Sequence, residues 1–348
     1  MPPPVLSTLP KGRPLVLALI GATSGIGSYT ARALCRTFAS NPKKLRVYLV
    51  GRNASRAASI LEYAKEVCPG SEWVFLEVED LALMSEVDDV ARRIEEAEEK
   101  KAFWSGEDEE GMKTRKRLDG MWLCQALSPM QESRVTKEGL DTQLSLLYYS
   151  RIHLIQKLIP LLISSPHPSH VISIFAGGYQ DRISTTGPPP IGTPSPKAYG
   201  MTSVRTNVVF MKTFLFEELA SKYAGKISFT HIYPGLVDGP TFYSVVNPWW
   251  ARMLWRVIMK PLLSWYMTSA EVCGDVMVGL LDSVRYPPQG GSGGKGEMST
   301  RAEPGDGAYG VGQRGDASGK VMYEGIRKED TGKRVWEHTM GVFEEIDK

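Results

Sequence analysis

Short apolar runs alternate with longer amphipathic segments along most of the chain. The runs are LVLALI, LRVYLVG, EWVFLEV, DGMWLCQA, HVISIFA and ISFTHIYPG, at 15–20, 45–51, 72–78, 119–126, 170–176 and 227–235. Their length and their content of Val, Ile and Leu are typical of strands that are buried on both faces. Helical segments follow them, including 24–38 and 136–162. The alternation predicts a doubly wound parallel α/β sheet with helices on both faces.

Three segments interrupt this alternation. A charged stretch occupies 98–117, a proline-rich one 184–196 and a glycine-rich one 287–319. None of them marks a second core, so we expect a single domain with surface insertions. Its predicted limits are an N-terminal extension at 1–13, a main domain at 14–285, and a Gly-rich loop with a C-terminal helix at 286–348 packed on the same domain.

Composition excludes several classes of function. The 41 basic residues nearly cancel the 39 acidic ones, and a formal charge of +2 is too small to indicate a nucleic-acid partner. The cysteines form no CxxC or CxH pattern, which predicts free thiols in a reducing, cytoplasmic compartment. The histidines lack HExxH-like spacing, so we expect no metal site.

An aromatic stretch, NPWWARMLWRVIMKPLLSWYM, begins at position 247. Arg252, Arg256, Lys260 and Pro261 interrupt it, which argues against a membrane span. An amphipathic helix covering a pocket is the first interpretation, which makes 240–268 a substrate lid. Shallow contact with a membrane surface is the second.

The sequence LALIGATSGIG places Gly21, Gly25 and Gly27 directly after the first strand and at the start of a helix. Glycine permits a tight turn and a close approach of the backbone, and the helix N-terminus offers free N–H groups to a pyrophosphate. The loop therefore predicts a Rossmann-type dinucleotide site. Its other expected members are Thr23, Ser24 and Ile26.

The second and third strands end with residues that bear on the choice of nucleotide. Gly51 and Arg52 stand where an acidic residue would bind a ribose 2′-hydroxyl. A guanidinium suits a 2′-phosphate instead, which favours NADP(H) over NAD(H). Asp80 follows the third strand, where it would accept a bond from the adenine amino group or serve as an N-cap.

These motifs resemble those of the short-chain dehydrogenase/reductase family over residues 14–285. The loop matches TGxxxGxG except that Ile20 replaces threonine. The segment YPGLVDGP resembles PGxVxT, with Pro234, Gly235 and Val237 retained and Gly239 in place of the threonine. The segments EGLDTQLSLLYYSRIHLIQKLIPLL and VWEHTMGVFEEI are similar to divergent fungal members associated with secondary metabolism. The resemblance implies that Pro234, Gly235 and Val237 lie over the nicotinamide, and that the protein forms a homodimer or homotetramer.

The family's catalytic tetrad is degenerate in this chain. Tyr199 matches the family tyrosine, whereas Ser203, Ala176 and Leu147 replace the lysine, serine and asparagine. Cys124 stands at an asparagine position of the family's NNAG motif, near the cofactor. Without the lysine, Tyr199 would donate a hydrogen bond or a proton but would be a poor base, which favours reduction. The alternative interpretation is that Tyr199 has a purely structural role.

Nearby residues offer alternative chemistry. Arg205 lies six positions after Tyr199, too far round a helix to replace a lysine at i+4. Lys197 precedes that helix, and further candidates follow the fifth strand: Tyr179, Ser184, Thr185 and Thr186.

The sequence thus predicts an NADPH-dependent oxidoreductase that reduces a carbonyl or activated double bond of an apolar natural-product intermediate. Two alternatives stay open, because a fold alone does not determine function. One is a redox-neutral isomerase, cyclase or dehydratase on the same scaffold. The other is a non-catalytic nucleotide-binding protein.

Overall fold

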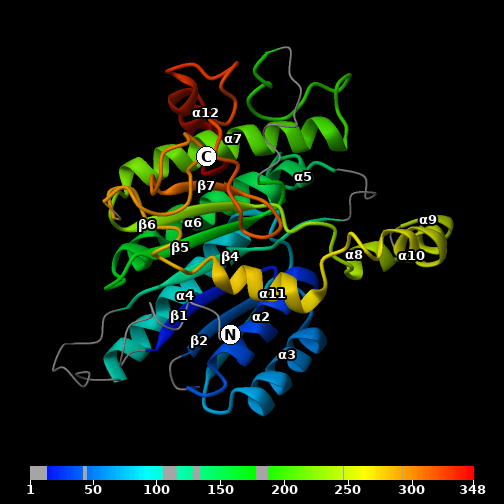
Figure 1. Ribbon diagram of the computed structural model, residues 1–348, viewed down its shortest axis with the longest axis vertical. Coiled ribbons are helices and arrows are strands. Elements are labelled where there is room, and N and C mark those ends of the chain that lie inside the picture. The colour runs from blue at the N-terminus through cyan, green and yellow to red at the C-terminus, as the bar shows by residue number, and fades with distance from the viewer. Residues whose placement is uncertain are drawn as a thin grey trace.

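A seven-stranded sheet forms the centre of the protein (Figure 1). The computed structural model describes residues 14–41, 45–104, 116–127, 134–177, 187–245, 247–291 and 293–348. The strand order is β3-β2-β1-β4-β5-β6-β7, and every neighbouring pair is parallel. The strands are β1 (Leu15–Ile20), β2 (Leu45–Gly51), β3 (Glu72–Glu77), β4 (Gly120–Leu123), β5 (Ser169–Ile174), β6 (Ile227–Ile232) and β7 (Ala308–Val311). The predicted doubly wound sheet is confirmed.

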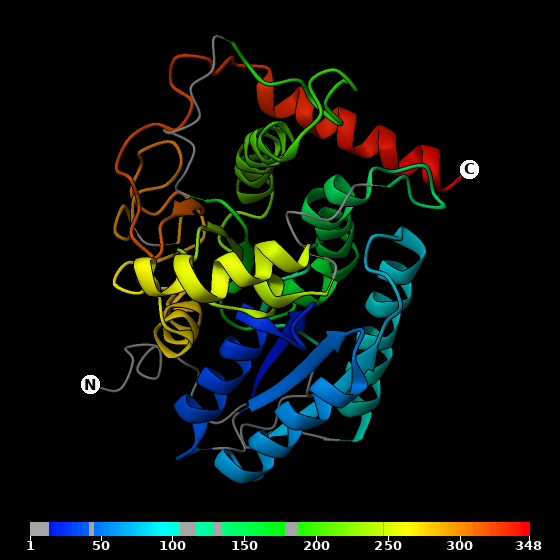
Figure 2. The same cartoon turned by 90° about the vertical axis from the view of Figure 1, so that its right-hand side faces the viewer.

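Helices cover both faces of this sheet, as Figure 2 shows. One apolar core lies under α2 (Gly25–Phe38), α3 (Ala54–Val67) and α11 (Ala270–Gly279). The other lies under α4 (Met84–Trp104), α6 (Ser150–Ile163), α7 (Met201–Lys222) and α12 (Thr331–Ile346). Shorter elements are α5 (Thr142–Leu144), α8 (Pro240–Tyr243), α9 (Trp249–Leu254), α10 (Lys260–Leu263) and the π-helical turns η2 (Ser145–Tyr149) and η4 (Trp255–Met259). No helix within the described ranges is long and apolar enough to cross a membrane.

The C-terminal segment belongs to the same sheet and core. Its strand β7 pairs with β6, which the glycine-rich sequence did not predict. The buried carboxylate of Glu217 on α7 accepts hydrogen bonds from both Nη atoms of Arg327, at 2.7 and 2.8 Å, and from the hydroxyl of Thr300, at 2.6 Å. A two-pronged bond from arginine to carboxylate fixes geometry as well as distance. These hydrogen bonds attach the C-terminal segment, residues 293–348, to α7.

Helix α12 packs against α7 (Figure 2). Side chains of α12 also contact α6 and the turn η2 before it. Tyr148 bonds Thr339 at 2.8 Å, and the ring of His153 lies 4.8 Å from that of Phe343. In the family that the sequence resembles, helices that correspond to α6 and α7 form the contact between subunits, which is why a homodimer or homotetramer was predicted. Since α12 covers part of that face, less of it is left for a second copy, and the homodimer or homotetramer stays a prediction.

The strand order also locates the site. The chain runs outwards from β1 through β2 to β3, then returns to β4 on the other side of β1. In an open parallel sheet this reversal leaves a crevice outside the carboxyl ends of the strands, where ligands bind.

Candidate nucleotide-binding and active site

The glycine loop between β1 and α2 is packed closely against its surroundings. Gly21 and Gly25 have φ values of +69° and +56°, a region that favours glycine. A Cβ on Gly21 would lie 2.7 Å from the backbone of Gln125, and one on Gly27 would lie 2.5 Å from the Cα of Ala22. Larger residues would displace the loop, so the glycines set its path.

The loop leads into an uncapped helix N-terminus. Ser24 is the N-cap of α2, but its side chain makes no capping hydrogen bond with a described residue, and the first turn contains no acidic residue. Backbone N–H groups at the start of a helix otherwise need such partners, and they bind anions well. The start of α2 therefore suits a phosphate group.

A cavity of about 570 Å³ opens at this place, within the range of about 300–1,000 Å³ typical of ligand sites. Its lining residues lie at or after the carboxyl ends of the strands β1 to β6. Of the predicted cofactor residues it is lined by Gly21, Thr23, Ser24, Gly25, Ile26, Gly27, Arg52, Asp80, Cys124, Pro234 and Val237. Gly235 does not line it; its φ of +82° turns the chain after β6 beside Gln313 and Thr268.

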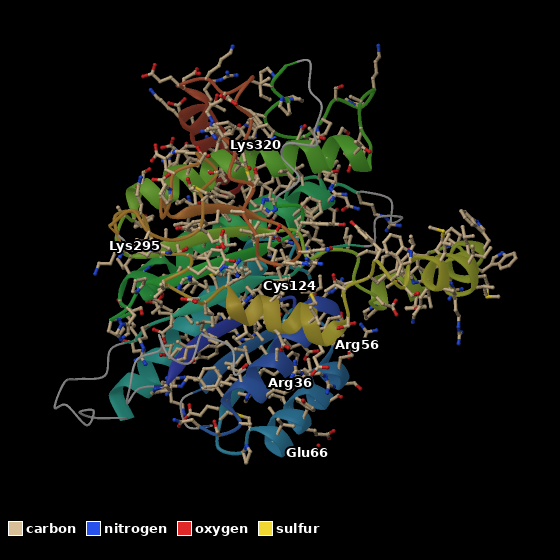
Figure 3. All side chains as sticks on the ribbon, in the orientation of Figure 1. Arg36, Arg56, Glu66, Cys124, Lys295 and Lys320 are labelled. Atoms are coloured by element: carbon tan, nitrogen blue, oxygen red, sulfur yellow. The ribbon has the colours of Figure 1, made fainter. Side chains whose placement is uncertain are left out.

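At one end, the cavity wall combines a glycine with two guanidinium groups. A Cβ on Gly51 would lie 2.5 Å from the Cγ2 of Thr23, so the loop fits closely over this glycine. Arg52 and Arg56 are exposed residues that both line the cavity, and Arg56 lies in the first turn of α3 (Figure 3). Sequence reasoning missed Arg56, although its place one turn after Arg52 was a usable signal.

Asp80 lines the same end without capping a helix. Its Oδ1 accepts the amide of Ala82 at 2.9 Å, which forms a local turn. Helix α4 begins at Met84, and the amides of Met84 and Ser85 are bound by the carboxylate of Glu138. The N-cap interpretation of Asp80 is therefore wrong for this helix, and its carboxylate stands at the cavity wall.

The opposite end of the cavity is mostly apolar. Its wall contains Leu146, Ile174, Phe175, Val237 and Phe242. Two polar residues, Gln125 and Cys124, also line the cavity. Cys124 is labelled in Figure 3. Gln125 is buried, and its Oε1 has no partner among the described residues. Burial raises the pKa of the Cys124 thiol to about 12, so it stays protonated at neutral pH.

A buried arginine forms hydrogen bonds with the backbone of residues in the wall of this apolar end. Arg151 donates through Nη1 to the carbonyl of Ile174 at 2.8 Å, through Nη2 to that of Gln125 at 2.6 Å, and through Nε to that of Leu146 at 3.1 Å. All three acceptors belong to residues that line the cavity. Burial lowers the pKa of Arg151 to about 10. The only sequence signal was a cation inside the apolar run LLYYSRIHLI.

Further basic groups lie beside Arg151. Lys212 is fully buried and donates to the carbonyl of Leu147 at 2.8 Å. Burial, and then these neighbouring cations, lower the pKa of both Lys212 and His231. The guanidinium carbon of Arg205 lies 5.9 Å from the ring centre of Phe175. Phe175 lines the cavity, so Arg205 lies beside one residue of the cavity wall, but it is not itself a lining residue.

The expected catalytic tetrad is not at the cavity. Tyr199 lies two residues before α7, is 38% exposed, and donates its hydroxyl to Asp141 Oδ2 at 2.8 Å. The hydroxyl of Ser203 donates to the carbonyl of Gly200, while Leu147 and Ala176 are buried. None of the four lines the cavity. The geometry thus favours the structural interpretation of Tyr199 over the catalytic one, because its phenol supports the N-cap of α5.

The alternative candidates fall into two groups. Lys197 is exposed and is not among the residues lining the cavity. Tyr179, Ser184, Thr185 and Thr186 lie outside the described residues. Within the described part of the chain, no group of three or more His, Cys, Asp or Glu side chains could hold a metal ion.

Tyr199→Phe is therefore expected to change turnover by no more than about threefold, and to cost about 1 kcal/mol or less for one exposed hydrogen bond. Asp141→Asn is the matched variant on the other side of the bond. Steady-state kinetics and urea unfolding measure the two effects. A loss of roughly 10²-fold in turnover with unchanged nucleotide affinity would restore Tyr199 as a general acid.

Comparison with known proteins identifies the family. The chain is 43% identical to the short-chain dehydrogenase/reductase SAT2 of Stachybotrys chartarum, over 99% of this chain and 96% of the relative. The chain belongs to the short-chain dehydrogenase/reductase family. It is 29% identical to the oxidoreductase andH of Emericella variicolor, over 95% of this chain and 92% of that one. No family model matches the chain.

Solved structures of short-chain dehydrogenases/reductases share the fold. The RhlG/NADP active-site complex of Pseudomonas aeruginosa superposes with a TM-score of 0.52 and 18% identity, covering 77% of this chain and 90% of that one. The 43% identical relative confirms the resemblance stated from the sequence, and with it the assignment of the protein as an oxidoreductase of this family.

Proposed function

We propose that this short-chain dehydrogenase/reductase is an NADPH-dependent reductase of a carbonyl or activated double bond in an apolar small molecule. The observation that carries the proposal is that a single cavity is lined both by the glycine loop with two guanidinium groups and by a set of apolar side chains. The glycine loop, the uncapped start of α2 and the guanidinium groups of Arg52 and Arg56 suit a dinucleotide with a 2′-phosphate. The RhlG complex of Pseudomonas aeruginosa contains NADP, which supports this nucleotide class.

The residues at the apolar end have distinct tasks in this proposal. Bound NADPH would supply the hydride. Leu146, Ile174, Phe175 and Phe242 would exclude water and hold an apolar substrate. Reduction of a carbonyl or of a conjugated double bond develops negative charge on oxygen. The cation of Arg205 lies beside the wall residue Phe175 without lining the cavity, and it would stabilise this charge from a distance. Arg151 would keep the wall in place rather than touch the substrate.

The reaction itself is tested by incubating the protein with NADPH and a panel of apolar ketones and enones. Loss of NADPH absorbance together with a gain of two hydrogens in product mass is expected. Nucleotide labelled with deuterium on the nicotinamide ring would place one deuterium in the product. Binding of NADPH without any mass change in the panel would count against reduction of these substrate classes.

A redox-neutral reaction is the second candidate, and the position of Tyr199 favours it. With the phenol bonded to Asp141, no described tyrosine–lysine pair stands at the cavity. Bound nucleotide would then shape the pocket for an isomerisation, cyclisation or dehydration. An isobaric or dehydrated product, formed without loss of NADPH, would support this candidate.

Arg52→Ala is expected to weaken NADPH binding by about 1–3 kcal/mol, the range for a hydrogen bond to a charged group, and to leave NADH binding nearly unchanged. Arg56→Ala is expected to act in the same direction. Titration of both nucleotides, followed by calorimetry, measures the difference. Arg36→Ala is the control, because Arg36 pairs with Asp275 and does not line the cavity. Equal losses for both nucleotides would contradict the assignment of Arg52.

The proposal includes a reducing, cytoplasmic location. All four cysteines are unpaired, and three of them are buried. Such thiols persist where disulfides do not form. Assembly into a homodimer or homotetramer is likewise proposed, and light scattering at micromolar protein tests it.

A further inference from the structure

Residues 249–266, which we call the aromatic arm, project from the body of the protein (Figure 1). The arm consists of α9, the π-helical turn η4 and α10 in direct succession, followed by Trp265 and Tyr266. The sequence interpretation placed a substrate lid here. In the structure only Pro240 and Phe242 of that lid line the cavity, and no residue of the arm does.

The arm exposes an unusual amount of apolar surface. Trp249 is 71% exposed and Trp265 is 82% exposed. Figure 3 shows many side chains of this segment projecting away from the body of the protein. The other large apolar side chains that the arm exposes are Trp250, Met253, Leu254, Val257, Ile258, Leu262 and Tyr266. Single exposed apolar residues are ordinary, but a contiguous set of this kind marks an interaction surface.

The charges of the arm all have one sign. Arg252, Arg256 and Lys260 follow one another at four-residue spacing, so they share one side of the helix beside the apolar surface. No aspartate or glutamate occurs between positions 239 and 270. A basic stripe beside exposed tryptophans and aliphatic side chains is the composition of helices that lie in the interface of a membrane.

The root of the arm is joined to the cavity. The ring of Trp255 stacks on Phe242, with centres 3.7 Å apart and planes inclined by 6°. Lys260 pairs with Asp238 at 2.7 Å. Phe242 and Asp238 both line the cavity. A surface that binds the arm would therefore lie next to the apolar end of the cavity.

We propose that the aromatic arm docks the protein on a lipid surface with anionic headgroups, so that an apolar substrate can enter the cavity from the membrane. Charge complementarity selects this partner, since anionic lipids attract basic segments near the surface. A second copy of the chain is disfavoured, because self-complementary pairing of two arms would bring their like charges together, and the arm itself contains no acidic residue to offset them.

The experiment is co-sedimentation of the full-length protein with vesicles of phosphatidylcholine alone, or of equal parts phosphatidylcholine and phosphatidylserine. Binding to the anionic vesicles is expected to be at least about tenfold stronger and to weaken with salt. R252Q/R256Q should remove about tenfold or more of that preference. W250S/W265S should weaken binding to both kinds of vesicle. Lys260 is left in place because it holds the root of the arm.

Two variants on the body serve as controls. Val284→Ser alters an exposed apolar residue outside the arm, and Lys333→Gln alters an exposed cation of α12. Both should bind vesicles like the unaltered protein. Titration with NADPH reports whether each variant is folded, independently of lipid. Equal binding to both vesicles, or arm variants that sediment like the controls, would overturn the proposal. A dimer in light scattering that the arm variants dissociate, without vesicle binding, would assign the arm to a second copy.

Discussion

Arg151→Met is expected to lower the free energy of unfolding by about 3–5 kcal/mol, the scale for breaking a buried charged network. The guanidinium is fully buried and bonds three backbone carbonyls and the hydroxyl of Ser173. Methionine fills a similar volume but donates nothing. The carbonyls of Gln125, Leu146 and Ile174 would then be buried without a donor, and each such group costs about 1–3 kcal/mol. The variant also no longer buries a cation, and the desolvation cost that is thereby avoided offsets part of the lost stability.

Urea unfolding followed by tryptophan fluorescence measures the loss. Arg36→Met is the matched control, because Arg36 is half-exposed and pairs with Asp275 at the surface (Figure 3). A pair of that kind contributes about 1 kcal/mol or less. Arg151→Lys should fall between the two, since an ammonium keeps the charge without the planar fork. If Arg151→Met and Arg36→Met had the same free energy of unfolding, the hydrogen bonds of Arg151 would contribute no more to stability than a surface ion pair does.

Much of the fold was predictable because its signals are local. Each of the first six strands contains a short apolar run, and burial on both faces of a parallel sheet requires such runs in the inner strands. The edge strand β3 is only partly buried. The glycine loop was predictable for a similar reason, since the positive φ of Gly21 and the close approach to Gln125 both require glycine. Strand β7 was missed because Ala308–Val311 is short, lies in a glycine-rich segment, and is stabilised by pairing with β6.

The catalytic end was less predictable because it depends on contacts distant in sequence. The start of α7 at Met201 places Arg205, rather than Tyr199, toward Phe175. That start cannot be read from the family motif, since the proline-rich insertion precedes it. Arg151 bonds partners 22–26 positions away along with the nearby Leu146, and no periodicity reveals such acceptors.

Gly51→Asp is expected to lower NADPH affinity by roughly 10²–10³-fold, because like charges brought together cost several kcal/mol and each 1.4 kcal/mol is tenfold. Gly51 ends β2 and lines the cavity next to Arg52. A carboxylate there would repel a 2′-phosphate and pair with the guanidinium that should bind it. The same carboxylate could accept a bond from a ribose 2′-hydroxyl, so NADH binding should fall far less.

The steric part of the substitution needs its own control. A Cβ at position 51 would lie 2.5 Å from the Cγ2 of Thr23, so any side chain disturbs the loop. Gly51→Ala carries the same Cβ without the charge and should weaken both nucleotides alike. Calorimetric titration of NADPH and NADH with the two variants separates the steric effect from the effect of charge. The ratio of NADPH affinity to NADH affinity should change by about 10²-fold in Gly51→Asp and hardly at all in Gly51→Ala. If the ratio stayed constant in both, this end of the cavity would not hold the 2′-phosphate, and the preference for NADPH proposed from Arg52 would be wrong.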